Sequence, residues 1–363
     1  MRVKLEDVCE RGSSNIKQSD IIKMSGNYPI YGASGLAGKV NFYHQEQPYV
    51  AVVKDGAGIG RTTLNPAKSS VIGTMQYLIP KKNVLPEYLF YVVSYMHLEK
   101  YYTGATIPHI YFKDYKNEEF NLDNIEKQLE IIDVLGRCKK VIEARKQELV
   151  ELDSLTKARF VEMFGDPVKN PKGWEVVTIG DIVTEVRYGT SKPAVEGGKY
   201  PYLRMNNLTA DGHLDLNDLK YIDIPDDEIE KCVVRKGDVL FNRTNSIELV
   251  GKTVVFDLQE DMIIAGYIIR VRLNKRLLPE ILSQYMNLEA LKDILRSMAK
   301  GAVNQANINA QELQSIKVYI PDMELQKQFI EMKNQVDKSK VAVQKALDET
   351  QILFDSLMQK YFG

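Results

Sequence analysis

The sequence predicts an α+β protein with two mixed α/β domains, each followed by a long helix, and with the two helices packing as a coiled coil. Three observations indicate this: two proline-free helical stretches, apolar positions at heptad spacing within both, and short motifs that occur twice in the same order. They divide the chain into domain 1–122, helix 123–164, domain 165–321 and helix 322–363.

The first domain is predicted to be rich in short strands. Residues 50–53 and 75–79 combine β-branched and aromatic side chains between Gly and Pro, which is typical of strands, and a third short strand is expected near 119–122. Residues 85–101 predict a helix, because Pro86 stands at an early helical position.

The stretch 123–164 consists mostly of good helix formers and would span roughly 60 Å as one helix. Gly165 and Pro167 mark its end, since Gly suits the position after a helix and Pro cannot continue one. Its apolar residues step by three and four along one face, which predicts a pairing seam. The residues expected in this seam are Ile131, Leu135, Ile142, Leu149 and Leu152.

The motifs of the first half return after Pro167. Leu85-Pro-Glu recurs as Leu278-Pro-Glu, and Lys127-Gln recurs as Lys327-Gln. The second helix has a seam of its own, expected at Phe329, Met332, Val336, Val343, Leu353 and Leu357. Two seams of equal phase favour a parallel or an antiparallel pair; the alternative is two amphipathic helices that each cover their own domain.

Composition excludes several classes of protein. No apolar run approaches the 18 residues of a membrane span, and the N-terminus lacks the apolar segment of a signal peptide. The three cysteines are far apart, which fits neither a disulfide framework nor a zinc site. We therefore expect a cytoplasmic protein without membrane contact. The net charge is −1, but residues 211–230 hold eight acids and one lysine, so the rest of that domain is basic.

No catalytic constellation is found. The glycines of residues 56–60 have the spacing GxGxG rather than that of a dinucleotide or phosphate loop, and tight turns explain them better. The four histidines have no ligand-like spacing to one another or to cysteine. We expect no metal site and no cofactor in this chain.

Polar and basic loop residues suit the edges of DNA bases, because Arg and Lys can contact guanine and Asn and Gln can contact adenine. The alternative is ordinary turn chemistry, which uses the same residue types. The candidates in the first domain are Lys39, Lys54, Arg61, Thr62, Thr106 and His109. Those in the second are Ser191, Lys192, Arg204, Asn206, Asn207, Arg243, Thr244, Asn245, Lys252, Lys300, Asn304, Gln305 and Asn307.

Over its full length the chain resembles the specificity subunit of type I restriction-modification enzymes. The motifs that carry the resemblance include KGWEVVTIGDI, YPYLRMNNLT, KGDVLFNRT and the helix entries NLDNIEKQLEI and IPDMELQKQF. One departure is that the first domain is about forty residues shorter than the second.

The resemblance implies a subunit without catalysis, in which each domain is a target-recognition domain for half of a bipartite sequence in double-stranded DNA. The helices would set the spacing and dock modification (methyltransferase) subunits, which bring S-adenosylmethionine. Restriction (motor-nuclease) subunits would join for cleavage, so ATP and Mg would belong to partners. Two alternatives stay open: a fused restriction-methyltransferase, against which the missing motifs argue, and a non-catalytic coiled-coil adaptor protein without DNA specificity.

Overall fold

The computed structural model describes residues 1–104, 108–299 and 305–363. These residues form two compact units. Unit 1 contains residues 1–146 and 344–363, and unit 2 contains residues 147–343. Each of the two long helices therefore contributes to both units.

Unit 1 is built on an antiparallel sheet with the strand order β2-β8-β5-β6. A smaller sheet, β4-β3-β7, lies beside it, and β1 pairs with β9. The strands are β1 (Arg2–Lys4), β2 (Cys9–Ser13), β3 (Tyr28–Gly32), β4 (Gly35–Val40), β5 (Tyr49–Val53), β6 (Thr62–Asn65), β7 (Ser70–Val71), β8 (Met75–Pro80) and β9 (Glu119–Asn121).

Helix α3 packs on β5, β6 and β8 and contributes much of the core of unit 1. The predicted helix at 85–101 is shorter than expected and ends at Tyr95. His97 has a left-handed backbone conformation (φ 50°), which interrupts the helix, and a 3-10 turn follows. The helical elements are α1 (Leu5–Val8), α2 (Gln18–Ile21), α3 (Pro86–Tyr95), η1 (Leu98–Tyr101) and α4 (Phe112–Tyr115).

Unit 2 repeats this arrangement. It has two four-stranded sheets, with the orders β11-β19-β15-β17 and β13-β12-β18-β14, and β10 pairs with β21. The first has the longer strands and is called the larger sheet below. The strands are β10 (Glu175–Thr178), β11 (Val183–Tyr188), β12 (Tyr200–Leu203), β13 (Lys220–Ile222), β14 (Val233–Val234), β15 (Val239–Asn242), β16 (Thr244–Asn245), β17 (Thr253–Val255), β18 (Met262–Ile264), β19 (Ile268–Leu273), β20 (Ala306–Asn307) and β21 (Lys317–Ile320).

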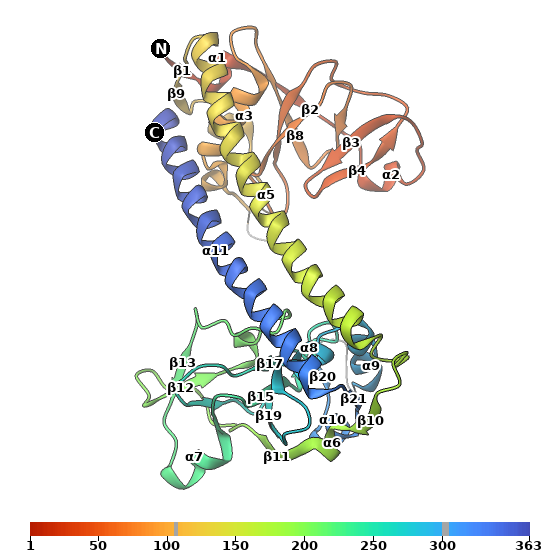
Figure 1. Cartoon of the computed structure of the whole chain (residues 1–363). Coiled ribbons are helices and arrows are strands. Elements are labelled where there is room, and N and C mark those ends of the chain that lie inside the picture. The colour runs from red at the N-terminus through yellow and green to blue at the C-terminus, as the bar shows by residue number, and fades with distance from the viewer. Residues whose placement is uncertain (105–107, 300–304) are drawn as a thin grey trace. The chain divides into compact units, whose positions relative to one another are not determined.

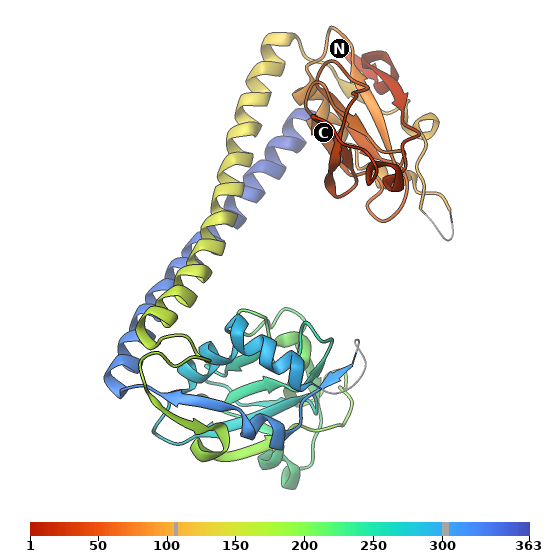
Figure 2. The same ribbon diagram turned by 90° about the vertical axis from the view of Figure 1, so that its right-hand side faces the viewer.

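Helices α8 and α9, which follow β19, cover one face of the larger sheet (Figure 2). These helices and that face form the main core of unit 2. The tandem repeat that the ordered motifs predict is seen in the strand order, since β2-β8-β5-β6 of unit 1 corresponds to β11-β19-β15-β17 of unit 2. The helical elements of unit 2 are α6 (Ile179–Ile182), η2 (Met205–Asn207), α7 (Asp226–Cys232), α8 (Pro279–Met286), α9 (Glu289–Met298) and α10 (Ala310–Ser315).

The long helices α5 (Ile125–Phe164) and α11 (Met323–Phe362) are each unbroken (Figure 1). In unit 2 the end of α5 packs against the start of α11: the buried ring of Phe160 lies 5.2 Å from that of Phe329. In unit 1 the start of α5 shares a core with the end of α11, through Leu135 and Met358. The pair is therefore antiparallel.

The seam of α11 follows the heptad, but half of its positions lie one residue later than expected. Lys333 and Lys340 lie in the seam one residue after Met332 and Ser339, and their side chains are 21% and 17% exposed. Leu353 is 52% exposed, so the prediction that it pairs the helices is wrong; its neighbour Phe354 packs on the core instead. Of the other expected positions, Ile131, Leu135, Ile142, Phe329 and Val336 are buried and Leu149, Leu152, Met332, Val343 and Leu357 are half-buried.

Candidate nucleic-acid interface

In unit 1 the loop that follows β5 is held against the segment that precedes α4. Gly56 donates its backbone N–H to the carbonyl of Pro108 (3.0 Å), and Nδ1 of His109 lies 2.7 Å from a carboxylate oxygen of Asp55. Burial alone would raise the pKa of Asp55, but hydrogen bonds from Lys54 and His109 outweigh it and lower that pKa. Two segments that are distant in sequence thus form one polar surface.

A concavity of about 510 Å³ lies beside this loop, and Asp55 is part of its wall. Amide, hydroxyl and ammonium groups can hydrogen bond to base edges. None of these lining residues was predicted as a DNA contact from the sequence, because only the fold brings them together. The polar lining comprises Asn15, Lys17, Gln18, Ser34, Asp55 and Thr74.

The candidates of unit 1 are dispersed rather than clustered. Lys39 and Arg61 are exposed, and Arg61 donates to the carbonyl of Ala33 at 3.0 Å. Thr62 donates to the carbonyl of Gly60 at 3.2 Å. Lys54 and His109 both pair with Asp55. Thr106 lies outside the described residues.

In unit 2 the corresponding loop begins with Arg243, directly after β15. Its guanidinium lies over the ring of Tyr188, 5.1 Å from the centroid, and one nitrogen donates to the carbonyl of Gly266 at 3.5 Å. Nε of Arg243 is buried and has no partner among the described residues. Tyr188 is 43% exposed, so Arg243 lies against an aromatic surface that sequence reasoning missed.

The segments paired in unit 1 have counterparts that pair in unit 2. Strand β16 forms a short antiparallel ladder with β20, and the side chains of Thr244 and Asn307 are hydrogen-bonded at 3.0 Å. Gln305 is exposed beside them, whereas the amide of Asn245 is used within its own loop. Lys300 and Asn304 lie outside the described residues.

Other candidates of unit 2 serve internal contacts. Asn207 is 2% exposed and holds its loop closed by donating to the carbonyl of Asp215, while Lys252 is 8% exposed and donates to the carbonyl of Met205. Burial lowers the pKa of Lys252. Neither side chain is available on the surface to contact DNA in this conformation. Both instead stabilise loops inside unit 2.

Four further candidates differ in their availability. Arg204 pairs with Asp218 at 2.7 Å, and Lys192 pairs with Glu228 at 2.9 Å, so both are partly neutralised. Ser191 and Asn206 are exposed. Asn206 stands at the start of the long connection between β12 and β13.

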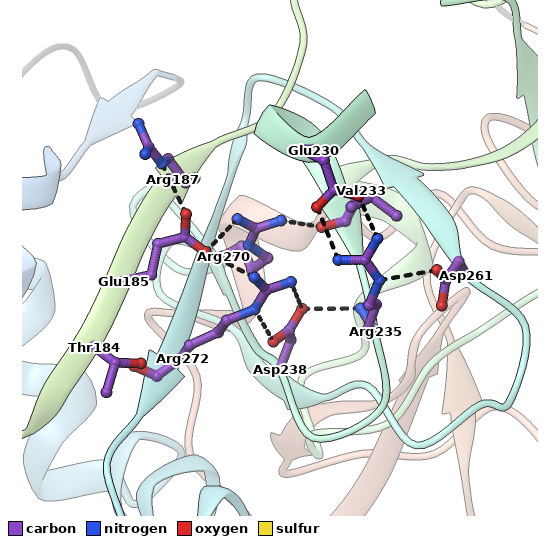
Figure 3. A network of polar contacts seen from close by, with 10 residues as sticks. All are labelled: Thr184, Glu185, Arg187, Glu230, Val233, Arg235, Asp238, Asp261, Arg270 and Arg272. Carbon is purple, nitrogen blue, oxygen red and sulfur yellow. Dashed lines mark hydrogen bonds and ion pairs between the residues drawn. The ribbon is translucent and has the colours of Figure 1, made fainter. Parts of the chain in front are cut away.

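A charged network fixes the strand that presents Arg243 (Figure 3). Arg270 is fully buried, pairs with Glu185 at 2.8 Å and donates to the carbonyl of Val233. Arg272 bridges Glu185 and Asp238, each at 2.8 Å. The network joins both sheets of unit 2, because Arg270 of β19 contacts Val233 of β14, and it holds the start of β15 through Asp238. Sequence reasoning could not find it, since Glu185 and Arg270 are 85 positions apart.

A second polar cluster attaches the β12–β13 connection to α11. Nδ1 of His213 lies 3.1 Å from Asp211, and its Nε2 lies 3.6 Å from Asp337. Lys340 contacts Asp153 of α5 at 2.5 Å and Asp211 at 3.7 Å. The carboxylates of Asp211 and then Asp337, which accept from the imidazole, raise the pKa of His213 to about 9. We name these five residues the clasp.

Within residues 1–104, 108–299 and 305–363, no group of three or more His, Cys, Asp or Glu side chains is arranged to hold a metal ion. In the same ranges, no helix combines the length and the apolar character needed to span a bilayer.

Comparison with known proteins identifies relatives over most of the chain. The sequence profile of the family described as type I restriction modification DNA specificity domain matches residues 1–153 and 171–350. The putative type I restriction enzyme MjaX specificity subunit of Methanocaldococcus jannaschii is 30% identical over 196 residues, which are 53% of this chain and 46% of that protein. The type I restriction enzyme EcoKI specificity subunit of Escherichia coli K12 is 29% identical over 189 residues, 50% and 40% of the two chains. The matches thus span less than half of either relative.

Among solved structures, the S subunit of a type I restriction-modification system from M. genitalium has the same fold. The two structures align over 100% of this chain and 96% of the other, with a TM-score of 0.59 and 15% sequence identity.

Proposed function

The chain belongs to the type I restriction modification DNA specificity family, and on this premise we propose that it is the DNA-recognition subunit of a type I restriction-modification complex. Each unit reads one half of a bipartite target in double-stranded DNA. The chain itself performs no chemistry; S-adenosylmethionine, ATP and Mg are bound by its modification and restriction partners.

The observation that carries the proposal is the repeated loop pairing. In unit 1 the loop after β5 pairs with the segment before α4, through Asp55 and His109. In unit 2 the loop after β15 pairs with the segment after α9, through Thr244 and Asn307. Both pairs place polar side chains on a rigid strand end. Such a position favours direct contacts with base edges, which require a fixed geometry.

The antiparallel helices supply the second element of the proposal. Because α5 and α11 each contribute to both units, they fix how far apart the two half-sites are read. They also provide the surfaces on which two modification subunits dock, one for each repeat.

Arg243→Ala tests the proposal. We assemble the variant with its modification subunits and measure methylation across a DNA library randomised in both halves. Losing an Arg–guanine pair costs about 1–3 kcal/mol of discrimination, so one base pair of one half-site should become relaxed. Arg243→Lys should behave similarly, because a lysine cannot form the two-pronged contact.

Arg276→Ala is the matched control: this arginine belongs to the same unit but is engaged with Glu175 at 2.5 Å on the surface. It should leave both half-sites intact. If Arg243→Ala weakens all sequences evenly, Arg243 contacts phosphate or supports the fold, and the proposed readout is refuted.

A further inference from the structure

The two units contain an equivalent groove, bounded by the edge strand of the larger sheet, the first helix after that sheet and a long helix. A buried glutamine in each long helix shows which positions of α5 and α11 are equivalent in the two units. Gln128 accepts the backbone N–H of Leu85 at 2.9 Å, and Gln326 accepts that of Leu278, also at 2.9 Å. Positions in α5 and α11 therefore correspond at an offset of 198.

In unit 2 this groove is filled by the chain itself. The β12–β13 connection, residues 204–219, brings Gly212 and His213 against β17, α8 and α11, and only about 140 Å³ remains open. Gly212 has a φ of +87°, and a Cβ there would lie 2.9 Å from the side-chain amide of Asn287, so the loop tip fits closely. Asp337 of α11 faces the imidazole of His213 at 3.6 Å.

In unit 1 the groove is open. The corresponding strands β3 and β4 are joined by Ala33 and Ser34 alone, so no loop reaches it. The hollow between β6, α3 and α5 has a volume of about 810 Å³. Its lining includes the counterparts of the unit 2 groove: Leu64 for Val255, Glu87 for Glu280, Phe90 for Ser283, Gly136 for Asn334 and Lys139 for Asp337.

The exchanged side chains indicate what the open groove accepts. Where unit 2 offers the carboxylate of Asp337 to the imidazole of His213, unit 1 offers Lys139, which is exposed and lies 5.0 Å from the ring of Phe90. Lys140 is exposed next to it, and Leu64 is 39% exposed on the opposite wall. The remaining charges of the lining are Glu87 and the ion pair of Asp133 with Arg137.

We propose that the groove of unit 1 binds an acidic loop of a modification subunit, in the way that the groove of unit 2 binds its own loop tip. A carboxylate of that loop pairs with Lys139, and an apolar side chain packs between Leu64 and Phe90. The choice of partner rests on the function proposed above. The groove makes the two modification subunits inequivalent, because only one of them has an open groove to enter.

The test counts modification subunits bound to the full chain by native mass spectrometry during a titration. Wild type should bind two copies. Lys139→Glu should bind the first copy normally and the second roughly tenfold more weakly or worse, since it places two carboxylates together. The matched control is Lys338→Glu, because Lys338 is the counterpart of Lys140 on α11 and is likewise exposed.

Gly136→Leu blocks the groove without threatening the fold. A Cβ at this position would have no heavy atom closer than 4.0 Å, and leucine favours a helix more than glycine does. This variant should also lose the second copy. The inference would be overturned if Lys139→Glu and Gly136→Leu both bound two copies with wild-type affinity. It would also be overturned if these variants assembled normally but bound all DNA sequences more weakly. Failure of wild type to bind any modification subunit would refute the proposed function itself.

Discussion

His213 makes the attachment of the β12–β13 connection to α11 dependent on pH. Hydrogen bonding of the imidazole to the carboxylates of Asp211 and Asp337 raises its pKa from 6.5 to about 9, against the opposing effect of burial. The imidazole is therefore protonated at neutral pH. Replacing it by glutamine removes the charge and leaves two carboxylates facing each other across the loop tip.

The direction of the effect follows from linkage. A group whose pKa is raised on folding stabilises the folded state fully below pH 6.5, and this contribution is lost as the pH rises through about 9. The pKa of Asp337 is lowered to about 2, because hydrogen bonds from His213 and Lys333 outweigh burial; its contribution is present above pH 3.8 and is lost as the pH falls towards 2.

The size of the effect is set by exposure. The shift of His213 would correspond to about 3 kcal/mol in a site fully shielded from water. Because the side chain is 40% exposed, solvent screening reduces the expected contribution to about 1–2 kcal/mol. The other charged groups around the loop tip are Lys333, Lys340, Asp257 and Glu280.

Hydrogen exchange at pH 7 measures this contribution locally. The amides of Thr209 and Asp215 are hydrogen-bonded within the loop, to the carbonyls of His213 and Asn207. In His213→Gln their protection should fall about 5- to 30-fold. His97→Gln, at an exposed histidine of unit 1, is the control and should change nothing. Equal protection in wild type and His213→Gln would refute the reasoning.

Two further predictions concern stability. Phe160→Ala removes a fully buried ring between α5 and α11 and should destabilise unit 2 by about 3–5 kcal/mol in urea denaturation, whereas Leu353→Ala, at an exposed position, should change stability by less than about 0.5 kcal/mol. Arg270→Ala removes a fully buried guanidinium together with its contacts to Glu185 and to the carbonyl of Val233, while Arg272 stays paired with Glu185, and it should cost about 3–5 kcal/mol. The exposed Arg187→Ala should be nearly neutral, and equal effects of these two variants in the same assay would contradict the network of Figure 3.

The helices and the repeat could be predicted because their signals are local. Heptad spacing identifies an amphipathic face without knowledge of what covers it, and Gly165 was recognisable as a helix end, which its φ of +88° confirms. The interruption at His97 had no such signal. A left-handed histidine depends on the packing around it rather than on the residue type.

The interface residues were less predictable, because residue type alone does not show whether a polar side chain is free. Lys252 and Asn207 satisfy backbone carbonyls inside unit 2, although their sequence context resembles that of Arg243. The aromatic support of Arg243 comes from Tyr188, which is 55 positions earlier in the numbering. Only the fold could reveal that contact.

The displaced seam and the filled groove have one explanation. At the offset of 198 that relates the helices, Lys333 and Lys340 correspond to Leu135 and Ile142, which are buried in unit 1. Lysines are costly in such positions unless they are paired. The clasp supplies that pairing, because the β12–β13 connection carries Asp211 to Lys340.

The inserted connection and the charged seam of α11 are therefore interdependent. Without the connection, Lys340 would keep only Asp153, and Asp337 would lose the imidazole that it faces. Unit 1 has neither the connection nor the buried lysines, so its groove can stay open while its seam remains apolar. The repeat thus preserves one scaffold, and a single insertion accounts both for the polar helix pairing in unit 2 and for the absence of an open groove there.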